Sequence, residues 1–285
     1  MELRGLLTAW RDSLARVQAP TLLIELQDQR LLIQPLKGGT ELDIPLPEGL
    51  CEAGLPTQVV ALGDFIGDLL VEQGWVKAQV VVALPLEGAV LRVVEAPQCT
   101  TAQTLREELE GQEQLLRLPF ALPHADLDLQ LLDPQRGRWL LVAARQAVVE
   151  AWLQVFDQAG AELKRLEPVQ LSWMAVAEAM RPTGLLLVQR VEAASCQLFA
   201  VIDQEPVYCD VLQGPPKSWG EQAAQVVRRL VDQQLLAPSA PWLVASELPT
   251  QPLQRLADEL GAQLELMCVP DPYTSVVLAG LARLA

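Results

Sequence analysis

The chain has 285 residues, of which 51% are hydrophobic and 20% charged, and its 36 acidic residues against 21 lysines and arginines give a formal net charge of −15. This length allows two domains or one large α/β unit with a sizeable core, and the composition excludes a disordered chain. A nucleic acid is not an expected partner, because the acidic chain repels phosphate backbones and has no basic stripe interleaved with aromatic residues.

The N-terminal region predicts an amphipathic helix followed by a strand hairpin. Apolar residues recur at steps of three and four over residues 3–17, and Pro20 ends that pattern. Two interpretations of this helix stay open, because it could dock on its own domain or, with Trp10 and its arginines, lie on a membrane surface or a partner. Residues 21–26 and 30–36 form the predicted hairpin.

Residues 41–167 predict a series of alternating strands and helices. The pattern is set by apolar runs separated by glycine, proline and polar turns. The expected elements are a short strand at 41–46, a helix at 58–73, a strand at 79–85 followed by a second strand, a helix, an alternating strand at 127–132, an apolar strand, a helix that ends at Gly160 and a strand that ends at Glu167.

The remainder of the chain predicts a second unit that is led by a hairpin like the first. A helix at 168–180 ends at a clear break over residues 181–184. The elements expected after it are strands at 185–190, 196–202 and 207–212, a helix at 218–234, a strand at 242–245, a helix at 252–260, a strand at 263–267 and a helix at 274–284. Alternating strands and helices indicate α/β layers.

The cysteines and the single histidine indicate no metal or redox site. The five cysteines lie far apart without a CxxC pair, so we expect small hydrophobic side chains in a reducing cytoplasm. His124 lies near Asp126 and Asp128, but Leu127 separates those acids in a strand of alternating faces, and a solvated loop edge is the preferred interpretation. A membrane span and an export signal are not expected, because no uninterrupted run of about 18 apolar residues and no signal pattern occur.

Four short motifs, taken in their order and spacing, resemble the first half of PilM-type pilus assembly proteins, the actin-like relatives of the division protein FtsA. These motifs are Ala83-Leu84-Pro85 with Arg92 on the next strand, Leu118-Pro119-Phe120, Ala143-Ala144-Arg145, and Ala159-Gly160 before the strand that ends at Glu167. The resemblance implies an α/β fold of the duplicated actin-like (ribonuclease H-like) kind. It implies a first subdomain at 1–78, on which 166–182 and the C-terminal helix pack, an inserted PilM/FtsA-type subdomain at 79–165 and a trimmed second half at 183–285.

The first hairpin departs from the phosphate-binding pattern of actin-like ATPases. In such enzymes two hairpins need small residues so that backbone N–H groups can approach the phosphates, and a carboxylate positions the metal ion. Glu25 keeps an acid at the strand end, but both expected glycines are replaced. Gln27 places a bulky side chain where the phosphate would lie, and Arg30 stands where a serine is expected.

The second hairpin departs further from this pattern. Family members carry an aspartate and a glycine two residues apart and then a threonine, whereas Gln189, Arg190 and Val191 occupy that place here, with Ser195 as the only remnant. The turn that would bind adenosine lacks its glycine pair and reads Ala-Ser-Glu at 245–247. We therefore predict a degenerate nucleotide site with no catalytic residue, no cofactor and no metal.

The resemblance implies a non-catalytic, actin-like scaffold of the inner-membrane type IV pilus assembly platform. Such proteins lie at the cytoplasmic face of the inner membrane and bind the N-terminal tail of PilN, a bitopic membrane protein, in a cleft between the first two subdomains. An extended peptide in a cleft needs strand edges and apolar pockets. The candidate cleft residues are Ala83, Leu84, Pro85, Arg92, Leu118, Pro119 and Phe120.

Several alternatives stay open from the sequence. The chain could be an actin-like ATPase that still binds ATP, or the cytoplasmic platform component of a type II secretion system. It could also be a peripheral protein that binds lipid through residues 3–17. A pilus motor ATPase as a second partner, and a homo-oligomer, are both compatible with the resemblance.

Overall fold

The computed structural model describes residues 19–27, 29–110, 116, 118–181, 183–190, 195–203, 205–212, 215–246 and 251–285. The helix expected at 3–17 and the candidate residue Val191 lie outside this part of the chain. The described chain forms two compact units. The first comprises residues up to Gly88, Arg145–Ser172 and Pro272–Ala285, and the second comprises Ala89–Ala144 and Trp173–Asp271. Within the described ranges, every helix is too short or too polar to cross a membrane.

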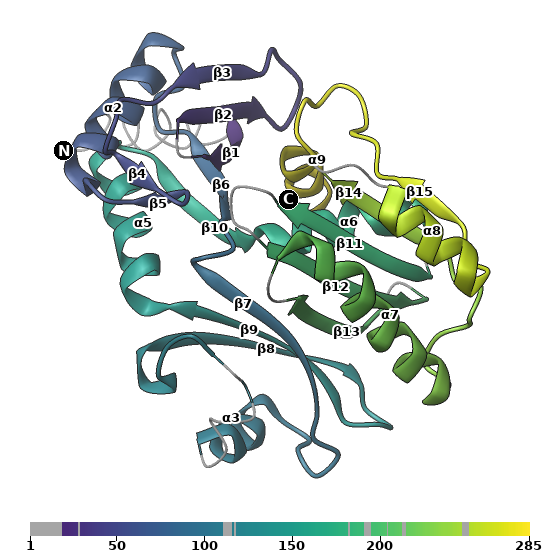
Figure 1. Ribbon diagram of the computed structural model, residues 1–285. Helices are drawn as coiled ribbons and strands as arrows, with labels where there is room; N and C mark the ends of the chain where they lie inside the picture. The colour runs from purple at the N-terminus through teal and green to yellow at the C-terminus, as the bar shows by residue number, and fades with distance from the viewer. Residues whose placement is uncertain are drawn as a thin grey trace, which may run out of the picture. The chain divides into compact units, whose positions relative to one another are not determined.

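A five-stranded sheet forms the centre of the first unit, in the order β10-β6-β1-β2-β3 (Figure 1). Its strands are β1 (Thr21–Leu26), β2 (Arg30–Pro35), β3 (Leu42–Pro45), β6 (Gln79–Leu84) and β10 (Glu162–Pro168). β1 pairs antiparallel with β2 and parallel with β6, which in turn pairs parallel with β10. The apolar run of β6, and that of β1 in which Glu25 is the only charged residue, fit central strands that are buried on both faces.

Two helices of the first unit lie side by side, α2 (Val59–Glu72) and α5 (Gln146–Gln158) (Figure 1). Their close approach depends on Gly63, where an added Cβ would lie 2.6 Å from the Cβ of Gln158 and 2.9 Å from a backbone oxygen of α5. On α5, the rings of Trp152 and Phe156 stack with centroids 5.8 Å apart and are fully buried. A short hairpin of β4 (Cys51–Glu52) and β5 (Leu55–Pro56) precedes α2.

The C-terminal helix α9 (Val276–Leu284) packs against β1 and β6 of the first unit. Gly280 lets α9 lie close to the backbone of Ser172, because a Cβ at position 280 would collide with the backbone oxygen of Ser172. Ser172 belongs to the first turns of α6 (Val169–Met180), which follows β10 directly. The last fourteen residues of the chain therefore belong to the same unit as its first strand.

The second unit contains a five-stranded sheet that repeats the arrangement of the first. Its order is β13-β12-β11-β14-β15, with three antiparallel strands followed by two that continue in parallel, as in β3-β2-β1-β6-β10. This repetition confirms the predicted hairpin-led second unit. Trp219 and Trp242 are fully buried in its core. The elements are β11 (Gly184–Arg190), β12 (Ser195–Ile202), β13 (Glu205–Leu212), α7 (Pro216–Asp232), β14 (Trp242–Ser246), α8 (Gln251–Leu260) and β15 (Leu264–Leu266).

A three-stranded sheet, β7-β9-β8, also belongs to the second unit. It comprises β7 (Ala89–Glu95), β8 (Ala125–Asp133) and β9 (Arg138–Arg145), together with α3 (Ala102–Glu110) and a 3-10 turn at Leu122–His124. Leu105 of α3 and Trp139 and Leu141 of β9 form its core.

The segment 79–165, expected to hold the inserted subdomain together with strands that bridge the two subdomains, has a strand at each end that pairs in the first sheet. Residues 79–84 form β6 and residues 162–168 form β10, and both strands are hydrogen-bonded into the first sheet beside β1. The physical reason is the apolar run of β6, which is buried over Val80 to Leu84 and needs covered faces on both sides. The separate three-stranded sheet starts only at Ala89.

Candidate functional site

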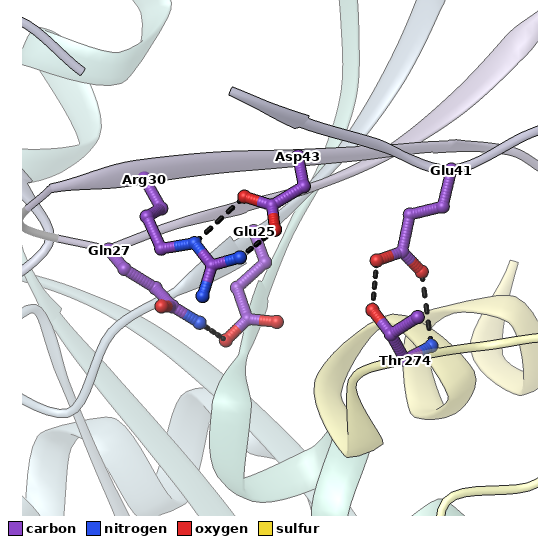
Figure 2. A network of polar contacts seen from close by, with 6 residues as sticks. All are labelled: Glu25, Gln27, Arg30, Glu41, Asp43 and Thr274. Atoms are coloured by element: carbon purple, nitrogen blue, oxygen red, sulfur yellow. Dashed lines mark hydrogen bonds and ion pairs between the residues drawn. The ribbon is translucent and has the colours of Figure 1, made fainter. Parts of the chain in front are cut away.

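The carboxylate of Glu25 lies near the carboxyl end of β1, beside the parallel strand β6. In open α/β sheets this end of the strands is where ligands bind. Glu25 is only 6% exposed. Its carboxylate accepts a hydrogen bond from Nε2 of Gln27 at 3.0 Å and another from the hydroxyl of Ser275. Figure 2 shows the Gln27 amide turned onto this carboxylate. The acid at the end of β1 is thus bound by side chains of the protein itself.

The side chains of the β1–β2 turn bond to one another and to β3. The backbone N–H of Gln27 donates to the carbonyl of Arg30 at 2.9 Å, which closes the turn. The guanidinium of Arg30 donates from Nε to Oδ1 of Asp43 at 2.8 Å and forms an ion pair with the same carboxylate (Figure 2). The arginine that replaces an expected serine is therefore held by β3.

The C-terminal segment reaches this site through two consecutive hydroxyl residues. Thr274 donates from its backbone N–H to Oε2 of Glu41 at 3.1 Å, and its hydroxyl bonds to the same carboxylate (Figure 2). Ser275 caps α9 by accepting from the N–H of Val277 at 3.0 Å, while its hydroxyl donates to Glu25. The segment before α9 is thus fastened to the β1–β3 part of the first sheet at two carboxylates.

A second buried carboxylate, Glu167, lies in register with Glu25. The parallel pairings join Glu25 to Ala83 and Ala83 to Glu167, so both glutamates stand at the same level of the sheet and on the same face. Glu167 is 7% exposed and forms an ion pair with Arg165. The sequence indicates Glu167 only as the end of the strand that follows Ala159-Gly160. Its alignment with Glu25 depends on strand register, for which the apolar runs give only a weak signal.

The second hairpin is described mainly through its backbone. Gln189 pairs with Cys196 and Arg190 with Ser195, at the end of the hairpin beside its turn. The side chains of Gln189 and Ser195, and the turn that contains Val191, lie outside what the structure describes. On β14, the partly buried Ala245 follows three buried residues. Residue 247 also lies outside the part of the chain that the structure describes.

Three of the candidate cleft residues lie in the first unit, at the end of β6. Ala83 and Leu84 are each 2% exposed, and Leu84 lies against Gly88. Pro85 follows the strand and is half-buried. Only Pro85 of these three offers side-chain surface to a ligand, because the other two are used in the core.

The other four candidate cleft residues lie in the second unit. Leu118 and Phe120 are partly buried and pack against the core of the inserted sheet, while Pro119 between them is exposed. Nη2 of Arg92 lies 3.9 Å from Oδ1 of Asp210 on β13. The hydroxyl of Tyr208 donates to the other oxygen of that carboxylate at 3.1 Å. Arg92 is therefore engaged in an ion pair within its own unit.

The remaining reactive side chains form no site in the described part of the chain. Four cysteines are buried and Cys268 is exposed, and burial raises the pKa of both Cys196 and Cys209 to about 12. His124 is exposed. Among the residues that the structure describes, no three histidine, cysteine, aspartate or glutamate side chains gather to hold a metal ion.

Known proteins resemble this chain in fold rather than in sequence. No family model and no curated protein matches it. A structure of the PilM-PilN type IV pilus biogenesis complex contains a chain with 21% identity, and the match covers 92% of this chain and 97% of that one with a TM-score of 0.64. A Bacteroides thetaiotaomicron protein with an actin-like ATPase fold and unknown function has 8% identity, coverages of 94% and 97% and a TM-score of 0.54.

A third solved structure is the cytoplasmic domain of EpsL, an inner membrane component of the type II secretion system of Vibrio cholerae. It has 14% identity, the match covers 93% of this chain and 94% of that one, and the TM-score is 0.50. The similarities extend over nearly the whole of each chain. The predicted actin-like fold, and its likeness to PilM, are therefore confirmed.

Proposed function

We propose that the protein is a non-catalytic scaffold of the type IV pilus assembly platform and binds the N-terminal cytoplasmic tail of a PilN-like membrane protein. The observation that carries this proposal is the bonding of Glu25. At the strand end where an actin-like ATPase positions its metal ion, the carboxylate is buried and accepts from Gln27 and Ser275. The near-complete overlap with a chain of the PilM-PilN complex supports the pilus context.

Catalysis by this hairpin is disfavoured by geometry as well as by residue type. A metal ion at Glu25 would have to displace the Gln27 amide and the Ser275 hydroxyl, and these two part-buried donors would lose their partner. Arg30 is also tied to Asp43 on the neighbouring strand β3. The described part of the hairpin therefore offers neither the small residues nor the unengaged carboxylate that phosphate transfer requires.

Charge favours the proposed partner. Cytoplasmic segments beside membrane helices carry an excess of lysine and arginine, so the tail of a bitopic protein tends to be basic. This chain has a net charge of −15, which attracts such a tail and speeds its encounter. The bound tail would hold the scaffold at the cytoplasmic face of the inner membrane and connect it there to the pilus motor ATPase.

The absence of nucleotide binding is tested by thermal unfolding of the full chain with and without ATP and Mg²⁺. A ligand at a hundredfold excess over its Kd stabilises a protein by about 2.7 kcal/mol, which shifts Tm by several degrees. We expect no shift. A clear shift would instead support the alternative of an actin-like protein that still binds ATP.

Tail binding is tested with a fluorescent peptide that carries the N-terminal tail of a PilN-like protein. Leu84→Asp is a poor test, because Leu84 is 2% exposed and a buried charge disrupts folding. Pro119→Lys is better, since Pro119 is exposed beside the partly buried Leu118. We expect about tenfold weaker binding of a basic tail. Pro134→Lys is the matched control, because Pro134 is an exposed proline of the same unit. Equal affinities of the two variants for the tail would show that residues 118–120 do not take part in binding it.

A type II secretion platform is the second candidate function, which the similarity to the EpsL cytoplasmic domain favours. Its TM-score of 0.50 is lower than the 0.64 of the PilM-PilN match. Deletion of the encoding gene separates the two, because the first proposal expects loss of pili and the second expects loss of protein secretion with normal pili.

A further inference from the structure

The sheet edges of this protein are protected in different ways. An exposed strand edge offers unpaired N–H and C=O groups to other chains, and proteins usually block it with charges, proline or a covering element. Four of the described edges are blocked in this way: β3 by Asp43 and Pro45, β10 by Lys164 and Arg165, β8 by Asp126 and Asp128, and β13 by its contact with β7.

The edge strand β15 (Leu264–Leu266) of the second unit has a single charged residue, Glu265, which is bound to Arg181, and an apolar run at the surface continues from its end. Leu266 is 55% exposed and Val269 is 37% exposed, and Cys268 between them is exposed as well. With the half-buried Met267 they form four consecutive apolar residues at the surface. Such a run is an aggregation hazard unless it has a binding role.

The hydrogen bonds of β15 show which of its backbone groups are directed outward. The carbonyl of Gln263 accepts from Trp242 at 2.7 Å, and the N–H of Met267 donates to Val244 at 2.9 Å, so both groups are directed toward β14. Backbone groups alternate in direction along a strand, so those of Leu264 and Leu266 are directed away from the sheet. The outward edge therefore presents the N–H of Leu266 and its carbonyl, which also accepts from Sγ of Cys268 at 3.7 Å, beside the exposed side chain of Leu266.

The exposed charges around this edge are mainly acidic. Asp258 and Glu259 lie exposed on the last turn of α8, which contacts β15, and Asp271 follows the apolar run. Arg181 is bound to Glu265 and adds no free positive charge there. A second copy of this chain would bring another net charge of −15 to the edge, which disfavours self-pairing.

We propose that the β15 edge binds an extended segment of another protein in which apolar and basic residues alternate, added as a further strand of the sheet. The outward backbone groups of Leu264 and Leu266 would pair with the segment. Leu266 and Val269 would cover its apolar side chains, and Asp258, Glu259 and Asp271 would attract its cations. The second unit alone supplies this surface, so the proposal does not depend on binding of a PilN-like tail.

The test uses two fluorescent octapeptides with the full chain, one alternating lysine and valine and the other glutamate and valine. Leu266→Pro removes one outward N–H and leaves the inward bonds of its neighbours, and prolines are tolerated in this way on edge strands. Leu266→Ala is the matched control, because it shortens the side chain but keeps the N–H group. Anisotropy should show binding of the lysine peptide only, about tenfold weaker for Leu266→Pro and only severalfold weaker for Leu266→Ala.

Hydrogen exchange of the unmodified chain gives a readout that does not depend on the folding of a variant. The lysine peptide should slow exchange at the amides of Leu264 and Leu266 and leave that of Met267, which is already paired, nearly unchanged. Equal affinity of the lysine peptide for the wild-type chain and for a folded Leu266→Pro variant, without slowed exchange, would show charge attraction alone and overturn the proposal. So would a concentration-dependent dimer that Leu266→Pro abolishes, because the occupant would then be a second copy.

Discussion

The carboxylate of Glu25 accepts a hydrogen bond from the hydroxyl of Ser275, a residue 250 positions further along the chain. This contact joins the first strand of the first unit to the cap of its last helix. The same hydroxyl accepts from the backbone N–H groups of Val277 and Leu278 at 3.0 and 3.4 Å. One side chain thus satisfies a buried acid and two helix-terminal donors, and Glu25 serves to hold the C-terminal segment.

Ser275→Ala should lower the free energy of unfolding by about 2–4 kcal/mol. The change removes a helix cap, typically worth about 1 kcal/mol, and a hydrogen bond to a buried carboxylate, worth about 1.5–3 kcal/mol. Urea unfolding followed by circular dichroism measures the difference. Ser275→Thr keeps the hydroxyl and is the control. A stability of Ser275→Ala equal to that of the wild type would show that the contact with Glu25 contributes nothing.

Most elements could be predicted because they depend on local pattern. The strand expected at 21–26 and the helix expected at 58–73 are found as Thr21–Leu26 and Val59–Glu72. In each, the spacing of apolar residues within the segment itself is enough to indicate the type of element. The internal repeat was also visible, because each unit starts with a hairpin. The strand expected at 79–85 is found as Gln79–Leu84, but its position between β1 and β10 could not be read from the sequence, since pairing partners leave little trace in a single chain.

The side-chain contacts of the site could not be predicted from the sequence. Glu25 was identified as a surviving acid, whereas its partner Ser275 comes from a loop before the last helix and has no motif. The alignment of Glu167 with Glu25 depends on strand register, which a shift of one residue would change. Arg92 was expected in a partner cleft because position alone does not reveal an ion pair with Asp210.

Gly280→Ala should destabilise the first unit, although alanine favours helices over glycine by about 1 kcal/mol. A Cβ at this position would collide with the backbone oxygen of Ser172, so α9 has to shift away from α6. Overpacking of this kind costs about 1–3 kcal/mol. Thermal unfolding measures the effect. Gly67→Ala is the matched control, because a Cβ there comes no closer than 3.2 Å to its neighbours, and a greater loss of stability for this control would contradict the prediction.

Arg92 and Asp210 should show energetic coupling in a double-mutant cycle of Arg92→Ala and Asp210→Asn. The ion pair joins β7 to β13 at 3.9 Å, and its side chains are 18% and 35% exposed, so solvent screening limits the coupling to about 0.5–1 kcal/mol. Urea unfolding of the two single variants and the double variant gives this value. If the effects of the two substitutions on stability are additive and Arg92→Ala binds the PilN-like tail more weakly, the prediction is wrong and Arg92 contributes to partner binding instead.

Only one thiol of the folded chain should react rapidly with a thiol reagent at neutral pH. Cys268 is exposed, whereas Cys196 and Cys209 are buried and burial raises the pKa of each to about 12, so the reactive thiolate is scarce. Counting the groups labelled before and after unfolding measures this. Cys268→Ser should remove the fast phase, and a fast phase that persists in this variant would contradict the assignment.

The same two buried thiols should make stability decrease at alkaline pH. Each pKa rises from 9.0 in the ordinary thiol to about 12 in the folded chain, so between these values the folded state holds protons that the unfolded state has lost. The stabilisation is therefore complete below pH 9 and is lost as the pH rises toward 12, by up to about 4 kcal/mol for each thiol. Urea midpoints measured from pH 8 to pH 10.5 should fall in the wild type. They should fall less in Cys196→Ala once its lower starting stability is subtracted, and parallel slopes for the two proteins would contradict a buried protonated thiol at Cys196.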